Sequence, residues 1–490
     1  MPKRKMSTFE RLQKGQLKRN ERRDLGRRID KGDPGLTVVN PDTAGIDVGN
    51  ESHFTAVPPD RDANPVQEFG SWTDALTQMV TWLKQCRIRT NALSTLAPVV
   101  MQATGVYWIA LEKMLLEAGF EVAVVNARGT KNLPGRKSDV QECEWLRKLH
   151  TYGLLRASFR LDETIEAVRT VWRQRERVVK NAGESVQQMQ KALTKMNVQL
   201  HNAISDLSGV TGMAILRAIV GGERDAMKLA QLRHRSIQAS EEEIARSLEG
   251  HWRTDTLWEL KEVLDAYDFH QRQLTACDEK LKEYIVQLPS KGAPEDKTET
   301  PALSAKDARK RRKKQLHKSK NQPVFELREE LVRVTGADLT AIDGISVMTA
   351  QTFFSEVGAD LSAFPTEGHF CSWLQLTPKR DVSGGKVIRH AKSPVQSRVA
   401  VALRMGAESL WHSDSYLGAR YRQLKARRGG LKATKGMARY LACLIYRLLK
   451  NGQEWVDRGA AYYEAKRKER ELRALERKAA ALGVKIVIAA

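Results

Sequence analysis

The spacing of apolar residues changes near Leu161, and this change limits the folds that the chain can adopt. Before this point the apolar runs are short and rich in β-branched residues, which is typical of strands separated by amphipathic helices. The expected strands cover 43–49, 52–58, 97–103 and 120–126, and the expected helices cover 71–87 and 106–118. A strand hairpin followed by strand–helix–strand alternation predicts an α/β domain over residues 40–160, with a mixed sheet covered by helices.

After Leu161 the apolar residues recur at alternating steps of three and four for more than four heptads, which favours a coiled coil. A first series runs from Val168 to Leu200 and is interrupted only by Arg175; a second runs from Val263 to Leu288. The sequence therefore predicts a helical coiled-coil region over 161–289, whose two long arms pair antiparallel within one chain or across a dimer.

The last third of the chain again has a mainly helical pattern, and we expect an α-helical domain over 324–474 followed by a tail over 475–490. A loop containing glycines is expected at 377–393. Gly344 lies between two helical patterns, where a tight turn could present backbone N–H groups to a phosphate or form an ordinary packing corner between helices.

The charge balance indicates a polyanionic partner. Lys and Arg number 82 against 59 Asp and Glu, which gives a formal net charge of +23. The expected basic arm, 1–36, holds twelve basic residues and four acids within its first 32 positions, and the expected flexible linker, 290–323, holds nine basic residues and one acid between Lys306 and Lys320. Two such segments favour nucleic-acid binding.

Other classes of protein are disfavoured by the sequence. The five cysteines are far apart and include no Cys-x-x-Cys pair, so neither a disulfide framework nor a structural zinc site is indicated. No secretory signal is seen, and no apolar run approaches the length of a membrane span. We expect a cytoplasmic protein without a membrane partner.

Three carboxylates are candidate ligands for a metal ion. Asp47 lies within an apolar strand, where burial of an acid must be offset by a partner or a metal ion. Asp139 and Glu142 lie three residues apart on one face of an expected helix. Carboxylate oxygens are ligands that Mg²⁺ prefers, and paired ions can stabilise a phosphodiester displacement. The alternative is structural, because strand acids often cap turns and the helix acids could pair with Arg136 and Lys137.

Several longer segments then point to one family by their order and spacing. They are GIDVGNESHFTAV (45–57), VVMQATGVYWIALEKML (99–115), the run from 125 to 159, VSGGKVIRH (382–390) and the helical pattern of 402–427. This arrangement resembles the DEDD-type insertion-sequence transposases, also called bridge-RNA-guided serine recombinases. The resemblance covers nearly all of residues 42–470.

The resemblance implies a RuvC-like amino-terminal domain of RNase H fold, a coiled-coil arm used in dimerisation, and a helical carboxy-terminal transposase domain. The four acids of the family correspond to Asp47, Gln102, Asp139 and Glu142, and its catalytic serine corresponds to Ser383. The amide at position 102 can still offer an oxygen to a metal ion but adds no negative charge.

The implied activity is recombination of DNA. By resemblance, a non-coding guide RNA pairs with donor and target DNA, the serine forms a transient phosphoserine, and carboxylates hold Mg²⁺ beside the same phosphate. The expected nucleic-acid-binding residues are Arg136, Lys137, Arg380, Lys386 and Arg389, which could offset phosphate charge. A homodimer or homotetramer associated with the nucleoid of a prokaryotic cytosol is expected.

Two rival interpretations stay open. In the first, the protein is a RuvC-like nuclease or junction resolvase in which metal-bound water is the nucleophile and Ser383 is a loop residue. In the second, Gln102 weakens metal binding so far that the protein only binds nucleic acid.

Overall fold

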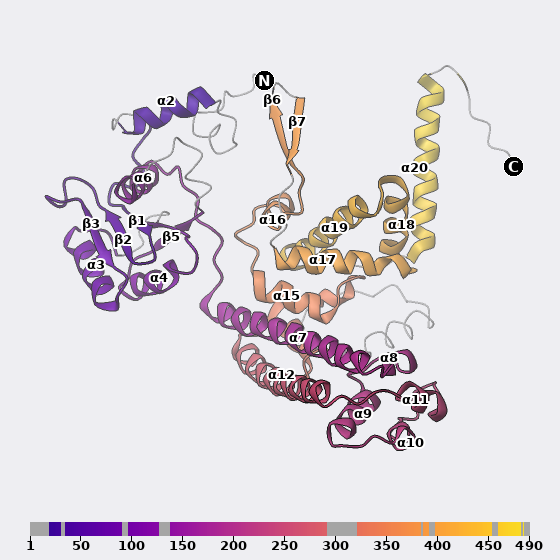
Figure 1. The fold of residues 1–490 in the computed structure, drawn as a ribbon. Coiled ribbons are helices and arrows are strands. Elements are labelled where there is room, and N and C mark those ends of the chain that lie inside the picture. The colour runs from indigo at the N-terminus through magenta and orange to yellow at the C-terminus, as the bar shows by residue number, and fades with distance from the viewer. Residues whose placement is uncertain are drawn as a thin grey trace. The chain divides into compact units, whose positions relative to one another are not determined.

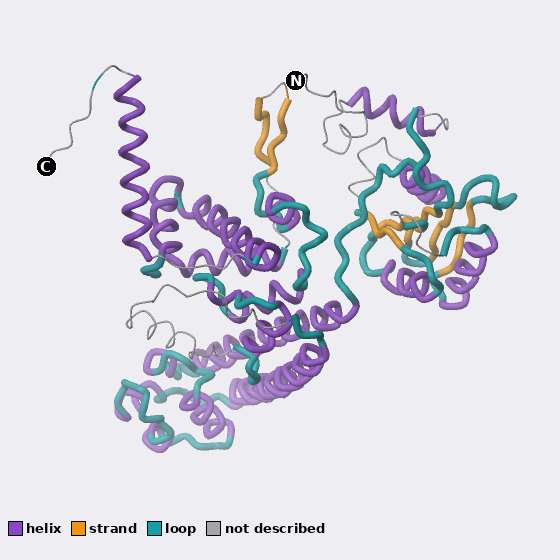
Figure 2. Tube along the Cα trace, turned by 180° about the vertical axis from the view of Figure 1, so that it is seen from behind, coloured by secondary structure: helices purple, strands orange, loops and turns teal. Residues whose placement is uncertain are grey.

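The computed structural model describes residues 19–30, 35–90, 97–126, 138–291, 321–383, 386–391, 397–452, 459–481 and 484. Contacts divide the chain into two compact units, residues 1–160 and 161–490 (Figure 1). In the described part of the chain, strands occur only in the sheet of the first unit and in one hairpin of the second (Figure 2). None of the helices within those ranges is long and apolar enough to cross a membrane.

The first unit is built on a mixed five-stranded sheet with the order β3-β2-β1-β4-β5. The strands are β1 (Ala44–Val48), β2 (Ser52–Ala56), β3 (Val66–Gly70), β4 (Val99–Gln102) and β5 (Val122–Val125). β1, β2 and β3 pair antiparallel, whereas β4 and β5 run parallel to β1. The mixed sheet confirms the expected α/β architecture and is compatible with an RNase H-like domain. The partly exposed β3 was not predicted, because its sequence VQEFG has few apolar residues.

Helices cover both faces of this sheet. On one face, α3 (Thr73–Gln85) and α4 (Trp108–Glu117) bury Met79 and Leu111 against Ile46 and Met101. On the other face, α6 (Asp139–Thr151) packs along β1, β2 and β4. β1 is therefore the central strand, with neighbours on both edges and helices on both sides.

Part of the expected basic arm is helical and packs against α6. Residues Arg19–Asp30 form α2, and its Leu25 and Ile29 are buried against Trp145 and Leu149 of α6. Leu25 and Ile29 are four residues apart and so lie on one helical face. Only two apolar residues of α2 are buried, and arginines surround them, so the composition of the segment indicates a basic arm and does not reveal this contact.

The second unit begins with two long helices, α7 (Glu163–Lys195) and α12 (Thr254–Gln287), which pack against each other within the chain. Ion pairs join Arg175 to Asp278 and Lys195 to Glu259, so the two helices run antiparallel. Four short helices close the far end of the pair around a shared core. They are α8 (Leu200–Ala203), α9 (Val210–Val220), α10 (Ala226–Ala230) and α11 (Glu241–Ser247).

Arg175, which was expected to interrupt the apolar series of the first long helix, is buried between α7 and α12. Its guanidinium Nε donates to Asp278 at 2.5 Å, and both side chains are less than 10% exposed. Nη1 of Arg175 also donates to the carbonyl of Asn321, while Asp278 accepts from the Val324 amide. The pair thus satisfies its hydrogen bonds and fastens the chain at 321–324 to the helical pair.

The remaining helices of the second unit pack in a series that begins at the α7–α12 pair: two of them contact the pair, and the others contact those two or one another. They are α14 (Leu327–Thr335), η1 (Leu339–Ala341), α15 (Val347–Val357), α16 (Glu367–Trp373), α17 (Arg398–Ser409), η2 (Leu410–His412), α18 (Tyr416–Arg428), α19 (Gly430–Asn451) and α20 (Gly459–Ala481). Between α16 and α17, the expected loop is instead a two-stranded hairpin of β6 (Lys379–Ser383) and β7 (Lys386–Ala391). The Val-Ile content of β7 favours a strand, and the glycines between the strands obscured it.

Gly344 forms a packing corner. Its φ of +86° is easily reached only by glycine, and a Cβ there would lie 2.7 Å from the carbonyl oxygen of Gly406 in α17. A Cβ on Gly406 would in turn overlap the carbonyl oxygen of Gly344. Two glycines in contact therefore let the turn before α15 touch α17, which favours the packing alternative over phosphate binding.

The buried ion pair generates a stability prediction. Asp278→Ala leaves the Arg175 guanidinium buried without its carboxylate, so the free energy of unfolding in urea should fall by about 3–5 kcal/mol. The double variant Arg175→Leu, Asp278→Leu removes both charges and should lose less than the single variant. A loss under about 1 kcal/mol for Asp278→Ala would show that the pair does not hold the helices together.

Candidate active site

The site is organised by a close contact between α6 and the central strand β1. Side chains alternate along a strand, so Gly45 and Asp47 lie on the same face of β1. A Cβ at Gly45 would overlap the Cys143 carbonyl oxygen and lie 2.5 Å from the backbone nitrogen of Arg147. The missing side chain of Gly45 therefore allows the α6 backbone to rest directly on β1.

The first turn of α6 brings two acids toward Asp47. Ser138 caps this helix by accepting a hydrogen bond from the Gln141 amide, which fixes where the helix begins. Asp139 and Glu142 occupy the first turn, immediately before Cys143, whose carbonyl lies against Gly45. Burial raises the pKa of the Asp47 carboxyl to about 6, with further increases from repulsion by Glu142 and then Asp139. The three carboxylates thus share one electrostatic environment.

Gln102 lies on the same sheet face as Asp47. The parallel register pairs Gly45 with Val100 and Ile46 with Met101, so the next position places Gln102 of β4 opposite Asp47 of β1. Gln102 is only 8% exposed. Its oxygen can serve as a neutral ligand or hydrogen-bond acceptor in this group, and as an amide it does not add to the repulsion that raises the pKa of Asp47.

The oxygen donors of this face suit a hard divalent cation. Asp47, Asp139 and Glu142 repel one another when ionised, and a cation between them would relieve that repulsion. Within the described ranges, no three His, Cys, Asp or Glu side chains form a ready-made metal-binding group. Mg²⁺ is usually held by one or two carboxylates, water and substrate phosphates rather than by an all-protein cage. The donor set therefore fits such an ion together with a phosphate substrate.

Ser383 is the last residue of β6 and pairs in register with Lys386, the first residue of β7. Arg380 pairs with His390 and Asp381 with Arg389, and the register shifts between Asp381 and Val382. The hairpin therefore gathers the backbone of Ser383 and of three predicted phosphate-binding residues, Arg380, Lys386 and Arg389. Arg136 and Lys137 lie outside the described residues.

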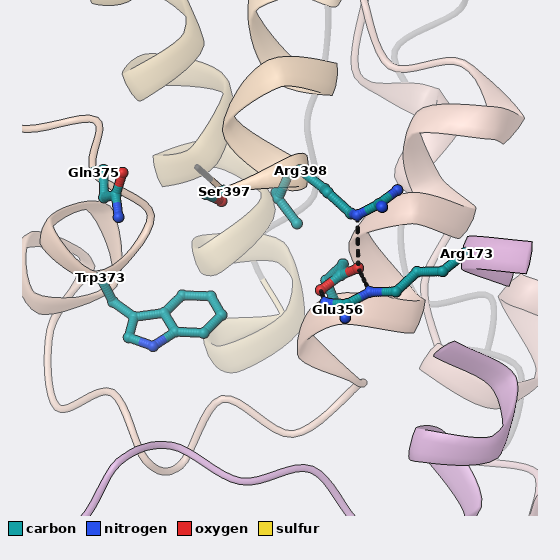
Figure 3. Close-up of a pocket in the computed structure, with 7 residues that line it drawn as sticks. Arg173, Glu356, Trp373, Gln375, Ser397 and Arg398 are labelled. Atoms are coloured by element: carbon teal, nitrogen blue, oxygen red, sulfur yellow. Dashed lines mark hydrogen bonds and ion pairs between the residues drawn. The ribbon is translucent and has the colours of Figure 1, made fainter. Parts of the chain in front are cut away.

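A pocket of about 360 Å³ lies at the base of this hairpin, between α7, α15 and the start of α17 (Figure 3). Its lining residues are Arg173, Glu356, Trp373, Gln375, Ser397, Arg398 and Val399. Arg173 donates twice to Glu356 at 2.7 Å, and Arg398 pairs with Glu176 of α7. These ion pairs anchor both ends of the segment that carries the hairpin. The sequence does not reveal these ion pairs, because the partners are about 180 to 220 residues apart.

The raised pKa of Asp47 leads to a test that needs no enzyme assay. The folded protein holds the proton of the Asp47 carboxyl more tightly than the unfolded chain does, whose ordinary aspartate pKa is 3.8. The stabilisation that comes from this protonation is therefore complete below pH 3.8 and is lost as the pH rises through about 6. Asp47→Asn should therefore raise the melting temperature at pH 8 and change it little at pH 4. Millimolar Mg²⁺ should stabilise the wild type at pH 8, but not this variant.

Differential scanning calorimetry of the full chain measures these effects. Asp265→Asn, on the exposed face of α12, is the control for loss of one carboxylate. A lower melting temperature for Asp47→Asn at pH 8, or the same Mg²⁺ response in the wild type and the variant, would contradict the assignment.

Two family models match the chain. One, a transposase model named for DEDD transposases of the IS110 type, matches residues 44–198. The other, described as the transposase IS116/IS110/IS902 family, matches residues 336–422. A search of curated proteins found no match. The β1–β4–α6 site lies in the first segment and the β6–β7 hairpin in the second, so each segment is similar to insertion-sequence transposases of the IS110 type.

Proposed function

We propose that this transposase is a DNA recombinase that moves its own insertion sequence through a covalent serine intermediate. The observation that carries the proposal is the convergence of Asp47, Gln102 and the first turn of α6 on one sheet face. The match to transposase models supports DNA as the substrate. The resemblance of VSGGKVIRH supports Ser383 as the nucleophile.

The proposed reaction is a transesterification. The Ser383 hydroxyl oxygen attacks the phosphorus of the scissile phosphodiester while its proton passes to a base. An oxygen–phosphorus bond to serine forms as the bond to one strand end breaks, and that end leaves as a hydroxyl. A hydroxyl of the new partner strand then attacks the phosphoserine, which restores the serine and conserves the phosphodiester. Arg380, Lys386 and Arg389 offset charge on the phosphate.

By the resemblance, the carboxylates of the sheet face would hold a metal ion beside the scissile phosphate. Asp47, Asp139 and Glu142 would hold Mg²⁺, with Gln102 contributing a neutral oxygen. When bound, the ion supplies charge stabilisation to the attacking and leaving oxygens. The protein's own contribution is positional, because the α6–β1 contact fixes the spacing of the carboxylates.

The proposal includes a guide RNA and self-association. By the resemblance, a structured non-coding RNA pairs with donor and target DNA, so that base pairing selects the sites while the protein binds backbone geometry. A homodimer or homotetramer would bring two scissile phosphates together. The α7–α12 pair is satisfied within one chain, so self-association would use its outer surface rather than the buried seam.

The serine intermediate is tested by a single substitution. With DNA carrying both element ends and the RNA encoded beside the element, wild-type protein should form an adduct that survives denaturing electrophoresis, and Ser383→Ala should form none. Ser372→Ala, at an exposed serine of α16, is the control and should keep the adduct. Cleaved DNA without an adduct, unchanged by Ser383→Ala, would instead support the metal-dependent nuclease.

The substitution Gln102→Glu tests the metal site and also the alternative in which the protein only binds nucleic acid. A fourth carboxylate beside Asp47 should increase repulsion, so the melting temperature without metal should fall at pH 8 and the stabilisation by Mg²⁺ should grow. Recombination should need less Mg²⁺. The control is Gln78→Glu on the exposed face of α3. An unchanged response to Mg²⁺, with recombination absent in both proteins, would favour a protein that only binds nucleic acid.

A further inference from the structure

The segment 416–452, which forms α18 and α19, is unusual in its charge. It contains ten lysine or arginine residues and no aspartate or glutamate. The two helices join at Gly429, whose φ is +78°, and pack against each other (Figure 1). A helical pair that carries one sign of charge repels itself, so the composition requires an explanation.

Six of the ten cations have structural surroundings that account for them. Arg447 pairs with Glu367, and Arg439 lowers the pKa of the same Glu367 carboxyl. Others donate to backbone carbonyls or lie over the rings of Trp411 and Tyr440; these are Arg420, Arg422, Lys425 and Lys450.

The other four cations, Arg427, Arg428, Lys432 and Lys435, are exposed and lie on either side of the bend at Gly429. No ion pair involves them within the described residues. Cations in the last turn of α18 favour that helix, but Lys432 lies in the first turn of α19, where the helix dipole disfavours positive charge. That first turn also contains no acid. Lys432 therefore opposes local stability, as a residue selected for binding would.

Gly436 adds an independent observation on the same surface. It lies in the interior of α19, is exposed, and has no heavy atom within 4 Å of the position that a Cβ would occupy. Glycine at such a site weakens the helix relative to alanine and here gains no packing. Lys432 and Gly436 are four residues apart and share one helical face. A bare stretch of backbone beside a lysine allows another molecule to approach closely.

We propose that Arg427, Arg428, Lys432, Lys435 and Gly436, together the elbow surface, bind the phosphodiester backbone of duplex DNA. Four unpaired cations complement the charge of a backbone that carries one phosphate per 3.4 Å of each strand. Duplex is favoured over single-stranded nucleic acid because no aromatic side chain is exposed within 416–452, whereas single-strand binding relies on stacking. The inference takes from the proposed function only the choice of DNA.

The test measures binding of full-length protein to a 30-base-pair duplex over a range of salt concentrations. Replacing the four cations of the elbow surface by glutamine should weaken binding at least tenfold near 100 mM salt. It should also reduce the slope of log affinity against log salt by about 3 to 4, since each phosphate contact contributes about 0.9. The control removes the same charge from exposed positions of α7 and α12: Lys191, Lys261, Arg272 and Lys282, each to glutamine.

A second pair of variants separates binding from stability. Gly436→Glu and Gly183→Glu both place an acid at an exposed helix glycine with open space around it, so both should fold at least as stably as wild type. Only Gly436→Glu should weaken DNA binding. Equal losses in the elbow and control variants, or a loss for structured RNA without one for duplex DNA, would overturn the inference. These binding results do not test the serine intermediate, because the adduct assay detects a covalent bond between Ser383 and DNA.

Discussion

The direct contact between the α6 backbone and the central strand at Gly45 determines the geometry of the candidate active site. Because Gly45 has no side chain, α6 lies close enough for its first turn to approach Asp47. The same contact orients the acids of that turn toward the face that carries Gln102. Burial and mutual repulsion then raise the pKa of Asp47, so the fold stores an unfavourable charge arrangement that a cation would relieve.

The second unit supports the hairpin that carries Ser383. The α7–α12 pair is a rigid support closed by its own core and by the buried Arg175–Asp278 pair. From α7, arginine and glutamate side chains reach α15 and α17, which flank the segment that carries Ser383. Long-range ion pairs thus hold the helices that precede and follow the hairpin against α7.

The sequence predicted the elements whose apolar periodicity is strong: four strands of the sheet, the two long helices and most of the carboxy-terminal helices. It missed β3 and the β6–β7 hairpin, whose strands are polar or interrupted by glycine, and the docking of α2 through two apolar residues. Arg175 was taken as a defect in the seam because its partner is 103 residues away. At the site, the types of Asp47, Asp139 and Glu142 suggested metal chemistry, but only the Gly45 contact and the strand register explain how they meet Gln102.

We expect a divalent cation to bind where Asp47, Gln102 and the first turn of α6 converge. Anomalous scattering from Mn²⁺ in crystals of the protein bound to a DNA substrate locates such an ion directly. We expect a peak about 2.0–2.3 Å from an Asp47 carboxylate oxygen and in contact with Glu142 or Asp139. A peak at another site, with the Asp47 carboxylate turned away from α6, would contradict it.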